Sequence, residues 1–276
     1  MPLTVTLATD ADHPAGEAGG DLLVEAFAAR GATARWVRWD DPAALDADVV
    51  AVRSTWDYIL RLEEYLAWTR RAADRTRLVN PAEVLAWNTD KGYLVGLAGT
   101  GVPVVPTRLV EGQVDIDGAV ADWGTAVVKP RVSAAGHGVT VVDAGSDPWA
   151  PGGATWLVQP LVASIRDAGE TSLFVLGSTF AQARKVPGPG EIRVQPRFGG
   201  RTVDVPVEAE AREVAVAAMD AAAALAGARP AYGRVDLMRL DDGVLAVSEV
   251  ELVEPGLYLD VQPGNAAGYA DAVLGL

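Results

Sequence analysis

The order of elements in the first 80 residues constrains the fold more than any other feature of the chain. Apolar strand-like runs alternate there with amphipathic helical patterns, at residues 3–9 (strand), 22–30 (helix), 34–39 and 48–52 (strands), 62–68 (helix) and 78–79 (strand). Helices between short strands predict parallel pairing, because parallel strands need a long crossover connection. We therefore expect an open, largely parallel sheet that binds its ligand beyond the carboxyl ends of its strands.

Polar side chains follow two of these predicted strands and are candidates for substrate recognition. They are Asp10 after the first strand, and Arg53, Ser54, Thr55, Trp56 and Tyr58 after the third. Arginine pairs with carboxylates and aspartate with ammonium groups, so this mixture suits an amino acid or a small peptide. In the alternative interpretation, Trp56 packs under the next helix and Arg53 forms a surface ion pair.

The remaining two thirds of the chain are rich in predicted strands. Helices are expected at 89–98 and 208–226, with a polar, partly helical stretch at 113–122. Strands are expected at 104–110, 126–128, 139–142, 156–158, 172–175, 180–185, 234–240 and 244–250. The last two form a hairpin, because Asp241-Asp242-Gly243 between them is a tight-turn sequence.

Lysine is rare in this chain. Of the 23 basic residues only Lys91, Lys129 and Lys185 are lysines, against a background rich in alanine, glycine and arginine. A lysine that persists in such a composition indicates a position that needs a compact ammonium group, as in phosphate binding, where the planar arginine fork is a poor substitute. Chance placement on the surface is the alternative.

A small-residue loop follows Lys129-Pro130 and contains Gly136 and Gly138. Glycine lets backbone N–H groups approach a phosphate closely, so the loop is a candidate phosphate-binding element. It is neither a Walker A loop, which needs Gly-Lys-Ser/Thr, nor a dinucleotide fingerprint, because no helix follows it. An ordinary glycine-rich hairpin is the alternative.

The predicted hairpin at 234–250 brings carboxylates together. Asp236 and Glu249 lie at similar distances from the turn, so they come opposite each other, and Glu251 falls on the same face as Glu249. Carboxylates that converge on a covered sheet repel one another unless a cation lies between them, and Mg²⁺ with nucleotide phosphates is a frequent solution. A solvated acidic face is the alternative, but flanking valines and leucines indicate a covered sheet.

The composition excludes several classes of protein. The formal charge of −14 disfavours nucleic acid and anionic membranes as partners, so a nucleotide site must be a local basic pocket. No cysteine is present, which excludes disulfides and thiolate chemistry. No apolar run reaches the roughly 18 residues of a membrane span. The N-terminal pattern is typical of a strand rather than a signal peptide, so a cytoplasmic protein is expected. We also expect a monomer or a homodimer.

These motifs together resemble the ATP-grasp superfamily over nearly the whole chain. The matching residues are Asp90-Lys91, Val128-Lys129-Pro130 with its glycine loop, Gln159-Pro160-Leu161, Gly169-Glu170-Thr-Ser172, Asp236 and Glu249-Val-Glu251. The stretch from Lys185 to Gly200 resembles bacterial glutathione synthetases. The Ser-Thr-Trp-Asp-Tyr motif at 54–58 is similar to a set of actinobacterial ATP-grasp proteins related to the cyclo-ligase of cycloserine biosynthesis.

The resemblance implies an α+β fold in which ATP lies between the last two of three subdomains. These are an open α/β substrate subdomain at 1–88, a central lid subdomain at 89–160, and a C-terminal antiparallel-sheet subdomain at 161–276. It also implies an ATP site made of Lys91, Lys129, Ser133, Gly136, His137, Gly138, Gln159, Pro160, Leu161, Val162 and Glu170.

For the chemistry, the resemblance implies that Asp236, Glu249 and Glu251 bind two Mg²⁺ ions, for which Mn²⁺ can substitute. The last ligand departs from the family's frequent asparagine. Lys185, Arg193 and Arg234 would neutralise the transferring phosphoryl group and the acyl oxyanion. The implied reaction joins small-molecule carboxylate and amine substrates through an acyl phosphate and forms ADP. An intramolecular cyclo-ligase, a kinase and a non-catalytic ATP-binding regulator remain as alternatives.

Overall fold

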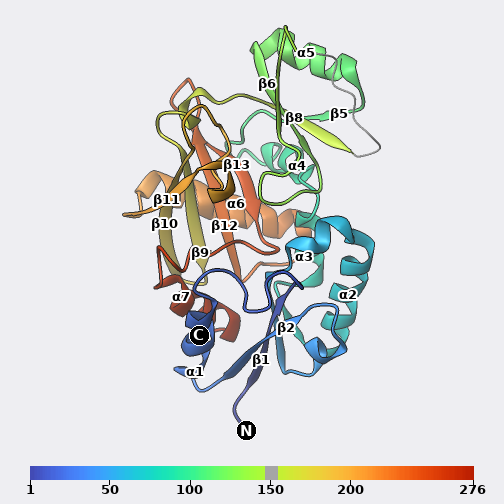
Figure 1. Ribbon diagram of the computed structural model, residues 1–276, viewed down its shortest axis with the longest axis vertical. Helices are drawn as coiled ribbons and strands as arrows, with labels where there is room; N and C mark the ends of the chain where they lie inside the picture. The colour runs from blue at the N-terminus through green and yellow to red at the C-terminus, as the bar shows by residue number, and fades with distance from the viewer. Residues whose placement is uncertain (147–154) are drawn as a thin grey trace.

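Three β-sheets organise the chain in the computed structural model, which describes residues 1–146 and 155–276 (Figure 1). One sheet is parallel and two are antiparallel, so the predicted α+β class is confirmed. The parallel sheet lies at one end of the molecule, a larger sheet at its centre, and a small sheet at the other end. No helix in the described ranges is long and apolar enough to cross a membrane.

The N-terminal sheet has the strand order β2-β1-β3-β4, and all its neighbouring strands run parallel. Its strands are β1 (Thr4–Thr9), β2 (Thr33–Arg38), β3 (Val49–Ser54) and β4 (Arg77–Val79). The crossover helices are α1 (Gly20–Ala28) and α2 (Leu62–Arg75), as the alternating pattern predicted. However, β3 continues past its predicted end, so Arg53 and Ser54 belong to the strand rather than to the loop beyond it.

The two faces of this sheet are buried in different cores. On one face α2 packs Tyr65 and Trp68 against the sheet. On the other, α1 packs beside the C-terminal helix α7 (Asn265–Leu274), and the Phe27 and Tyr269 rings meet edge to face with centroids 6.5 Å apart. Burying a side chain such as Phe27 contributes about 1.5–3 kcal/mol. This second core continues into the central sheet and joins the two ends of the chain.

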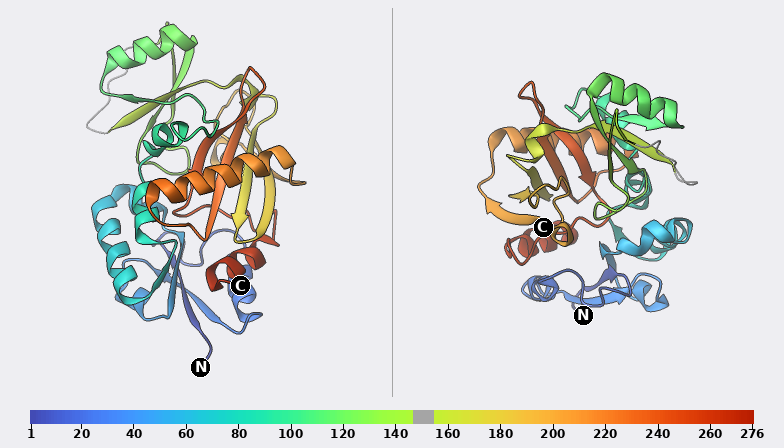
Figure 2. Two further views of the ribbon diagram at one scale, coloured as in Figure 1. Left: turned by 180° about the vertical axis from the view of Figure 1, so that it is seen from behind. Right: turned by 45° about the horizontal axis from the view of Figure 1, so that its top comes forward.

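The central sheet has the order β11-β10-β9-β12-β13 and is antiparallel throughout. Its strands are β9 (Glu170–Leu176), β10 (Thr179–Val186), β11 (Arg201–Val205), β12 (Tyr232–Arg239) and β13 (Leu245–Glu251). The long helix α6 (Ala209–Ala226) covers one face of the sheet (Figure 2), and its small buried residues Ala211, Ala215, Ala218 and Ala222 form a single stripe.

Two short helices lie in this region, and only the second falls within the helix predicted over 89–98. They are α3 (Ala82–Asn88) and α4 (Tyr93–Ala98), and both share the apolar core beneath α6. Asn88 ties α3 to the backbone of β13 through a 2.7 Å hydrogen bond from its Nδ2. Lys91 lies in the turn between the two helices and is therefore fixed relative to the central sheet.

The small sheet has the order β5-β8-β6-β7 and carries one helix on its outer face (Figure 1). Its elements are β5 (Arg108–Val110), α5 (Gln113–Trp123), β6 (Thr125–Pro130), β7 (Thr140–Asp143) and β8 (Trp156–Pro160). The strand expected over 104–110 is shorter than predicted, because Val104 pairs with Val247 of β13 instead. The connection into the small sheet is thus anchored on the central one.

Candidate active site

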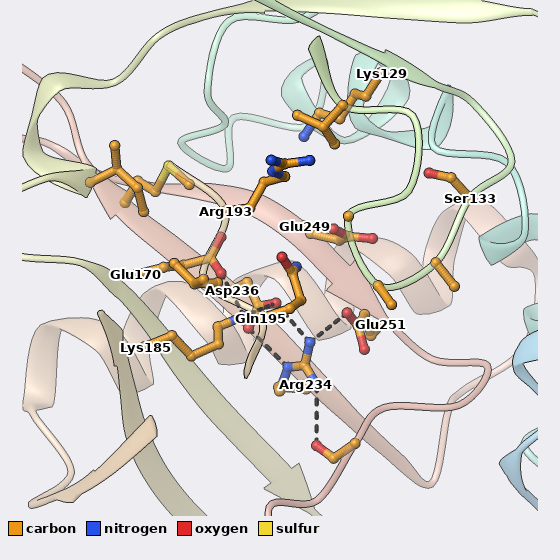
Figure 3. Close-up of a pocket in the computed structure, with 18 of the residues that line it drawn as sticks. Lys129, Ser133, Glu170, Lys185, Arg193, Gln195, Arg234, Asp236, Glu249 and Glu251 are labelled. Carbon is orange, nitrogen blue, oxygen red and sulfur yellow. Dashed lines mark hydrogen bonds and ion pairs between the residues drawn. The ribbon is translucent and has the colours of Figure 1, made fainter. Parts of the chain in front are cut away.

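A cavity of about 590 Å³ lies between the small sheet and the central sheet and reaches the segment that follows β3. All three lysines of the chain, Lys91, Lys129 and Lys185, line it, although they come from separate segments. Figure 3 shows acidic and basic side chains of β9, β10, β12 and β13 facing one another at its floor. The lysines are therefore gathered at one place rather than scattered over the surface.

Asp236 and Glu249 lie directly opposite each other on β12 and β13, which is the pairing that the hairpin pattern predicted. Glu251 follows on the same strand, opposite Arg234. A β-bulge just after Asp236 leaves Ser248 as an extra residue on β13. All three carboxylates line the cavity.

Two cations and a hydroxyl enclose the carboxylate of Asp236. Lys185 Nζ lies 2.8 Å from Oδ2, Arg234 donates through Nε and Nη2 at 2.9 Å each, and Ser172 Oγ donates at 2.6 Å. Burial alone would raise the pKa of Asp236, but Arg234 and Lys185 outweigh it and hold that pKa well below its usual value. Asp236 is therefore a carboxylate over the whole neutral range.

Arg234 bridges Asp236 to Glu251, whose Oε1 it binds at 2.5 Å. Burial raises the pKa of Glu251 to about 7, against the effect of Arg234, and the nearby Asp236 and Glu249 carboxylates add to the rise. Of the three hairpin carboxylates, Glu251 is thus the one whose charge the surrounding cations compensate least. The arrangement favours the arrival of a further cation.

Lys91 reaches the cavity floor from the turn between α3 and α4. Its Nζ lies 3.0 Å from Glu249 Oε1 and also donates to the carbonyl oxygen of Ser133. Burial lowers the pKa of Lys91, but Glu249 more than compensates, so that the pKa is raised. Lys91 therefore links the glycine-rich loop to the carboxylates of the hairpin.

Lys129, at the end of β6, differs from the other two lysines. Its ammonium group makes no hydrogen bond or ion pair with any residue of the described ranges, although Lys129 lines the cavity. Burial lowers its pKa, and the neighbouring Lys91 adds to that shift. A half-buried ammonium group without a partner is the kind of group that an incoming anion stabilises.

Within residues 1–146 and 155–276, no group of three or more Asp, Glu or His side chains is arranged so that it could hold a metal ion. The predicted set of Asp236, Glu249 and Glu251 shares one cavity but is not assembled as a metal centre. The reason is that each carboxylate is held by a lysine or an arginine.

The segment from Gln159 to Val162 passes along the cavity wall, as expected for the connection after β8. Gln159 is held by a 2.8 Å bond from its Nε2 to Thr107 Oγ1, and Val162 packs in a small apolar core. Glu170, at the start of β9, accepts from Ser248 Oγ at 2.8 Å and pairs with Lys185 Nζ at 2.5 Å. Its carboxylate is therefore engaged by two partners from other strands of the central sheet.

The glycine-rich loop lies over the cavity in part. Ser133 and Gly136 line it, whereas His137 and Gly138 do not. A Cβ atom on Gly136, where φ is +70°, would meet Gln195 Oε1 at 2.7 Å, so the glycine allows the loop to pack on the segment after β10. His137 is exposed, which agrees with the alternative that it is a surface residue of the loop.

Arg193 lines the cavity from the segment between β10 and β11, opposite Lys129 in Figure 3. Its guanidinium forms a 2.5 Å ion pair with Glu191 and lies 3.7 Å from the centroid of the Phe198 ring. Side chains in the same segment thus hold Arg193 in place without sealing it from the cavity.

The predicted substrate residues divide into two groups. Trp56 and Tyr58, in the short 3₁₀ helix Trp56–Leu60, line the cavity. The others lie outside its lining: they are Asp10, Arg53, Ser54 and Thr55. Asp10 serves its own loop instead, where Oδ1 accepts from His13 N at 2.9 Å and contacts His13 Nδ1 at 2.7 Å.

Arg53 requires a correction, because the structure encloses it completely. Its guanidinium pairs with Glu17, donates to Pro255 O at 2.8 Å and stacks 4.6 Å from the Tyr269 ring centroid. Glu17 in turn accepts from the Leu257 amide at 2.6 Å. Neither a direct substrate contact nor a surface ion pair describes this residue, which holds the segment after β13 against the N-terminal sheet.

Sequence reasoning missed the lining residues of that segment, among them Glu254 and Tyr258. Tyr258 has a positive φ of 52°, and its ring centroid lies 5.1 Å from the Arg234 guanidinium. Glu254 comes three residues after Glu251 in an acidic, apolar stretch, and this continuation of the hairpin pattern was the signal available for it.

Comparison with known proteins agrees with this geometry. A family model described as "D-cycloserine synthetase DcsG, N-terminal domain" matches residues 5–80. The cycloserine biosynthesis protein DcsG of Streptomyces lavendulae is 32% identical over 98% of this chain and 95% of its own length. The crystal structure of D-cycloserine synthetase DcsG superposes with a TM-score of 0.84 at 29% identity, covering 99% of each chain.

More distant structures share the fold. The ATP-grasp RimK domain protein of Sphaerobacter thermophilus has a TM-score of 0.69 at 21% identity, over 99% of this chain and all of its own. The ATP-grasp ligase PsnB, solved with a precursor, Mg and ADP, has a TM-score of 0.65 at 18% identity, over 100% and 99% of the two chains. The chain belongs to the ATP-grasp ligase family, as a homologue of the D-cycloserine synthetase DcsG.

Proposed function

We propose that this ATP-grasp ligase activates the carboxylate of an amino acid or a small peptide-like compound as an acyl phosphate, which an amine then captures. The observation that carries the proposal is the meeting of three lysines and three hairpin carboxylates in one cavity. Cations suit the phosphates of a nucleotide, and the carboxylates suit the metal ions that accompany it.

The nucleotide would lie between the small and the central sheets. Lys129, which lacks a partner in the described structure, and Lys91 would hold the phosphates, with Ser133 and Gly136 of the loop above them. The backbone from Gln159 to Val162 would meet the adenine ring, as the family resemblance implies. Glu170 would take the ribose hydroxyls or the adenine amine by exchanging its contact with Lys185.

The donor set suits Mg²⁺ in its chemistry, and its three carboxylates would have to exchange their lysine and arginine partners to bind the ion. Carboxylate oxygens are the ligands that Mg²⁺ prefers, and Asp236, Glu249 and Glu251 share one cavity face. When bound, Mg²⁺ would supply positive charge to the transferring phosphoryl group. Lys91 and Arg234 would then release carboxylates for phosphate oxygens, so that each charge keeps a partner. We propose two such ions.

Two steps account for the reaction. In the first, a substrate carboxylate oxygen attacks the γ-phosphorus, the bond to the β-bridging oxygen breaks, and ADP leaves. Lys185, Arg193 and Arg234 would neutralise the charge on the moving group, which is the main requirement of phosphoryl transfer. In the second step a nitrogen attacks the acyl carbon, phosphate leaves and the nitrogen loses a proton, which yields a C–N bond.

Cyclisation within one substrate molecule is a second candidate, favoured by the similarity to a D-cycloserine synthetase over nearly the full length of both chains. In that case the attacking nitrogen belongs to the activated molecule itself. ADP release without any added amine would then accompany formation of a product that has lost one water.

The test is ADP release with each standard amino acid, in both configurations, with and without hydroxylamine. Hydroxylamine captures an acyl phosphate as a hydroxamate, so a ligase gives ADP and hydroxamate in equal amounts. A kinase gives ADP and a phosphorylated product without hydroxamate. Absence of ADP release with all of these acids contradicts the proposed substrate class.

A further inference from the structure

Glu254 is a nearly buried acid without a partner. Its residue is 8% exposed, and its carboxylate makes no hydrogen bond or ion pair with any residue in the described part of the chain. Neither carboxylate oxygen of Glu254 belongs to the fully inaccessible polar atoms without a partner in that part. Since Glu254 lines the cavity, its carboxylate faces the cavity space rather than the protein interior.

The other acids at the cavity floor each pair with a lysine or an arginine. Glu170 and Asp236 share Lys185, Glu249 pairs with Lys91, and Glu251 pairs with Arg234. No lysine or arginine in the described part of the chain forms an ion pair with Glu254, although the charges of Lys91 and Arg234 act on it from a distance. A carboxylate held out of water needs compensating donors, so this one is arranged for donors that a ligand brings.

The backbone around Glu254 is held firmly on the side that leads away from the hairpin. Pro255 O accepts from Arg53 at 2.8 Å, and the Leu257 amide donates to Glu17 at 2.6 Å. On its other side, Val253 is buried in the core beneath α2. The carboxylate is therefore presented from a preorganised segment, as a binding group requires.

Glu254 also lies on the side of the cavity that the 3₁₀ helix Trp56–Leu60 lines. Burial raises the pKa of the Tyr58 phenol, and the charge of Glu254 adds to that rise, which puts the two side chains in one neighbourhood. Trp56 lines the same region. Lys129 and the segment 159–162 belong to the opposite, small-sheet side.

We propose that Glu254 binds the ammonium group of the amino acid whose carboxylate accepts the phosphoryl group, in a subsite walled by Trp56 and Tyr58. This inference rests on the function proposed above. An ammonium group brings both the opposite charge and three N–H donors to the buried carboxylate. Burial and Glu251 raise the pKa of Glu254 to about 8 in the free protein. A bound ammonium group opposes that shift and keeps Glu254 ionised.

The experiment compares each amino acid that supports ADP release with its 2-hydroxy analogue, using the full-length protein and hydroxylamine as the common nucleophile. For Glu254→Gln, kcat/KM for the amino acid should fall about 10- to 100-fold, the range for losing a charged hydrogen bond. The value for the hydroxy acid and the KM for ATP should change less than about threefold. Glu254→Asp should recover part of the preference, and Glu213→Gln, an exposed acid on α6, should match the wild type.

Four outcomes overturn the inference. Equal losses for the amino and hydroxy acids assign Glu254 to structure, and a rise in the KM for ATP assigns it to the nucleotide. An unchanged preference for the amino acid, with an active enzyme, removes this subsite alone. Failure of the wild type with every amino acid removes the proposed function first and the subsite with it. Melting temperatures with Mg-ADP identify variants that are misfolded. If Glu254→Gln is one of them, the preference for the amino acid over its hydroxy analogue is measured on Glu254→Asp instead.

Discussion

Asp236 and Glu249 stand opposite each other on β12 and β13, and each is paired with a lysine from a different segment, Lys185 and Lys91. In the absence of ligand these lysines balance carboxylates that would otherwise repel one another across the strand pair. Binding of Mg²⁺ and nucleotide phosphates would exchange the partners without leaving a buried charge alone. The hairpin and its lysines are thus a charge-balanced precursor of the proposed site.

Glu249→Gln tests the role of the hairpin directly. The amide keeps the shape of the side chain, so the protein should fold, but it removes a metal-binding charge. We expect Mg²⁺-dependent ADP formation to fall at least about 100-fold, because a bound metal supplies several kcal/mol of charge stabilisation. Glu213→Gln serves as the control. Turnover of Glu249→Gln at the wild-type rate would place the metal site elsewhere.

Lys129→Met separates nucleotide binding from stability. Because burial lowers the pKa of the unpaired Lys129, its replacement by an apolar chain should leave the melting temperature of the free protein equal or higher. The stabilisation by Mg-ADP, about 2.7 kcal/mol at a hundredfold excess over Kd, should largely disappear. Thermal melts with and without Mg-ADP give both quantities. Arg70→Ala, which replaces an exposed residue of α2, is the control. A full ligand shift in Lys129→Met would exclude Lys129 from the phosphate site.

Local patterns in the sequence predicted most strands of the three sheets, but they missed β11. The Asp241–Gly243 turn and the period of two fixed the pairing of Asp236 with Glu249, since a slip by one residue would turn every side chain to the other face. Helices α3 and α7 were missed. Helix α3 begins directly after Asn80-Pro81, and this helix-start signal was interpreted only as the end of a strand. Helix α7 carries Gly268 in its interior, which weakens the helical pattern.

The site was predictable only where its residues belong to short motifs that can be recognised in the sequence. The three lysines and the hairpin acids are such residues, and they do meet in one cavity. Arg53 was assigned to the substrate because it followed a predicted strand end, but β3 extends through it. Its partners Glu17 and Pro255 are 36 and 202 residues away in sequence, and no periodicity reports a contact of that kind.

The ion pair of Arg53 and Glu17 should matter for stability. The two side chains are 0% and 9% exposed, and removing one partner of a buried pair leaves the other uncompensated. Arg53→Met and Glu17→Gln should each lower the free energy of unfolding by about 3–5 kcal/mol, and the double variant by much less than the sum. Urea denaturation measures all three.

The exposed pair Arg229–Asp220 offers a matched control, with side chains 74% and 53% exposed. Arg229→Met should cost no more than about 1 kcal/mol. Strictly additive losses for Arg53→Met and Glu17→Gln would show that the two residues act independently, contrary to the buried pair.

Trp56 and Trp39 form a second matched comparison. Trp56 lines the cavity and meets His13 edge to face at 4.6 Å between ring centroids, whereas Trp39 is 1% exposed in the core beneath α2. Trp56→Ala should raise the KM for the amino acid substrate and leave the ATP affinity nearly unchanged. Trp39→Ala should instead lower stability by about 3–5 kcal/mol. A loss of stability in Trp56→Ala with intact kinetics would make Trp56 a core residue.

The transfer of oxygen from substrate to phosphate tests the central claim most directly. The amino acid that supports ADP release is labelled with ¹⁸O in its carboxylate, and the inorganic phosphate formed during turnover is analysed by mass spectrometry. An acyl-phosphate pathway moves one carboxylate oxygen into each phosphate, because the acyl carbon keeps only the other when nitrogen attacks. We therefore predict singly labelled phosphate in equal amount to ADP. Unlabelled phosphate, released together with ADP and product, would contradict activation of the carboxylate.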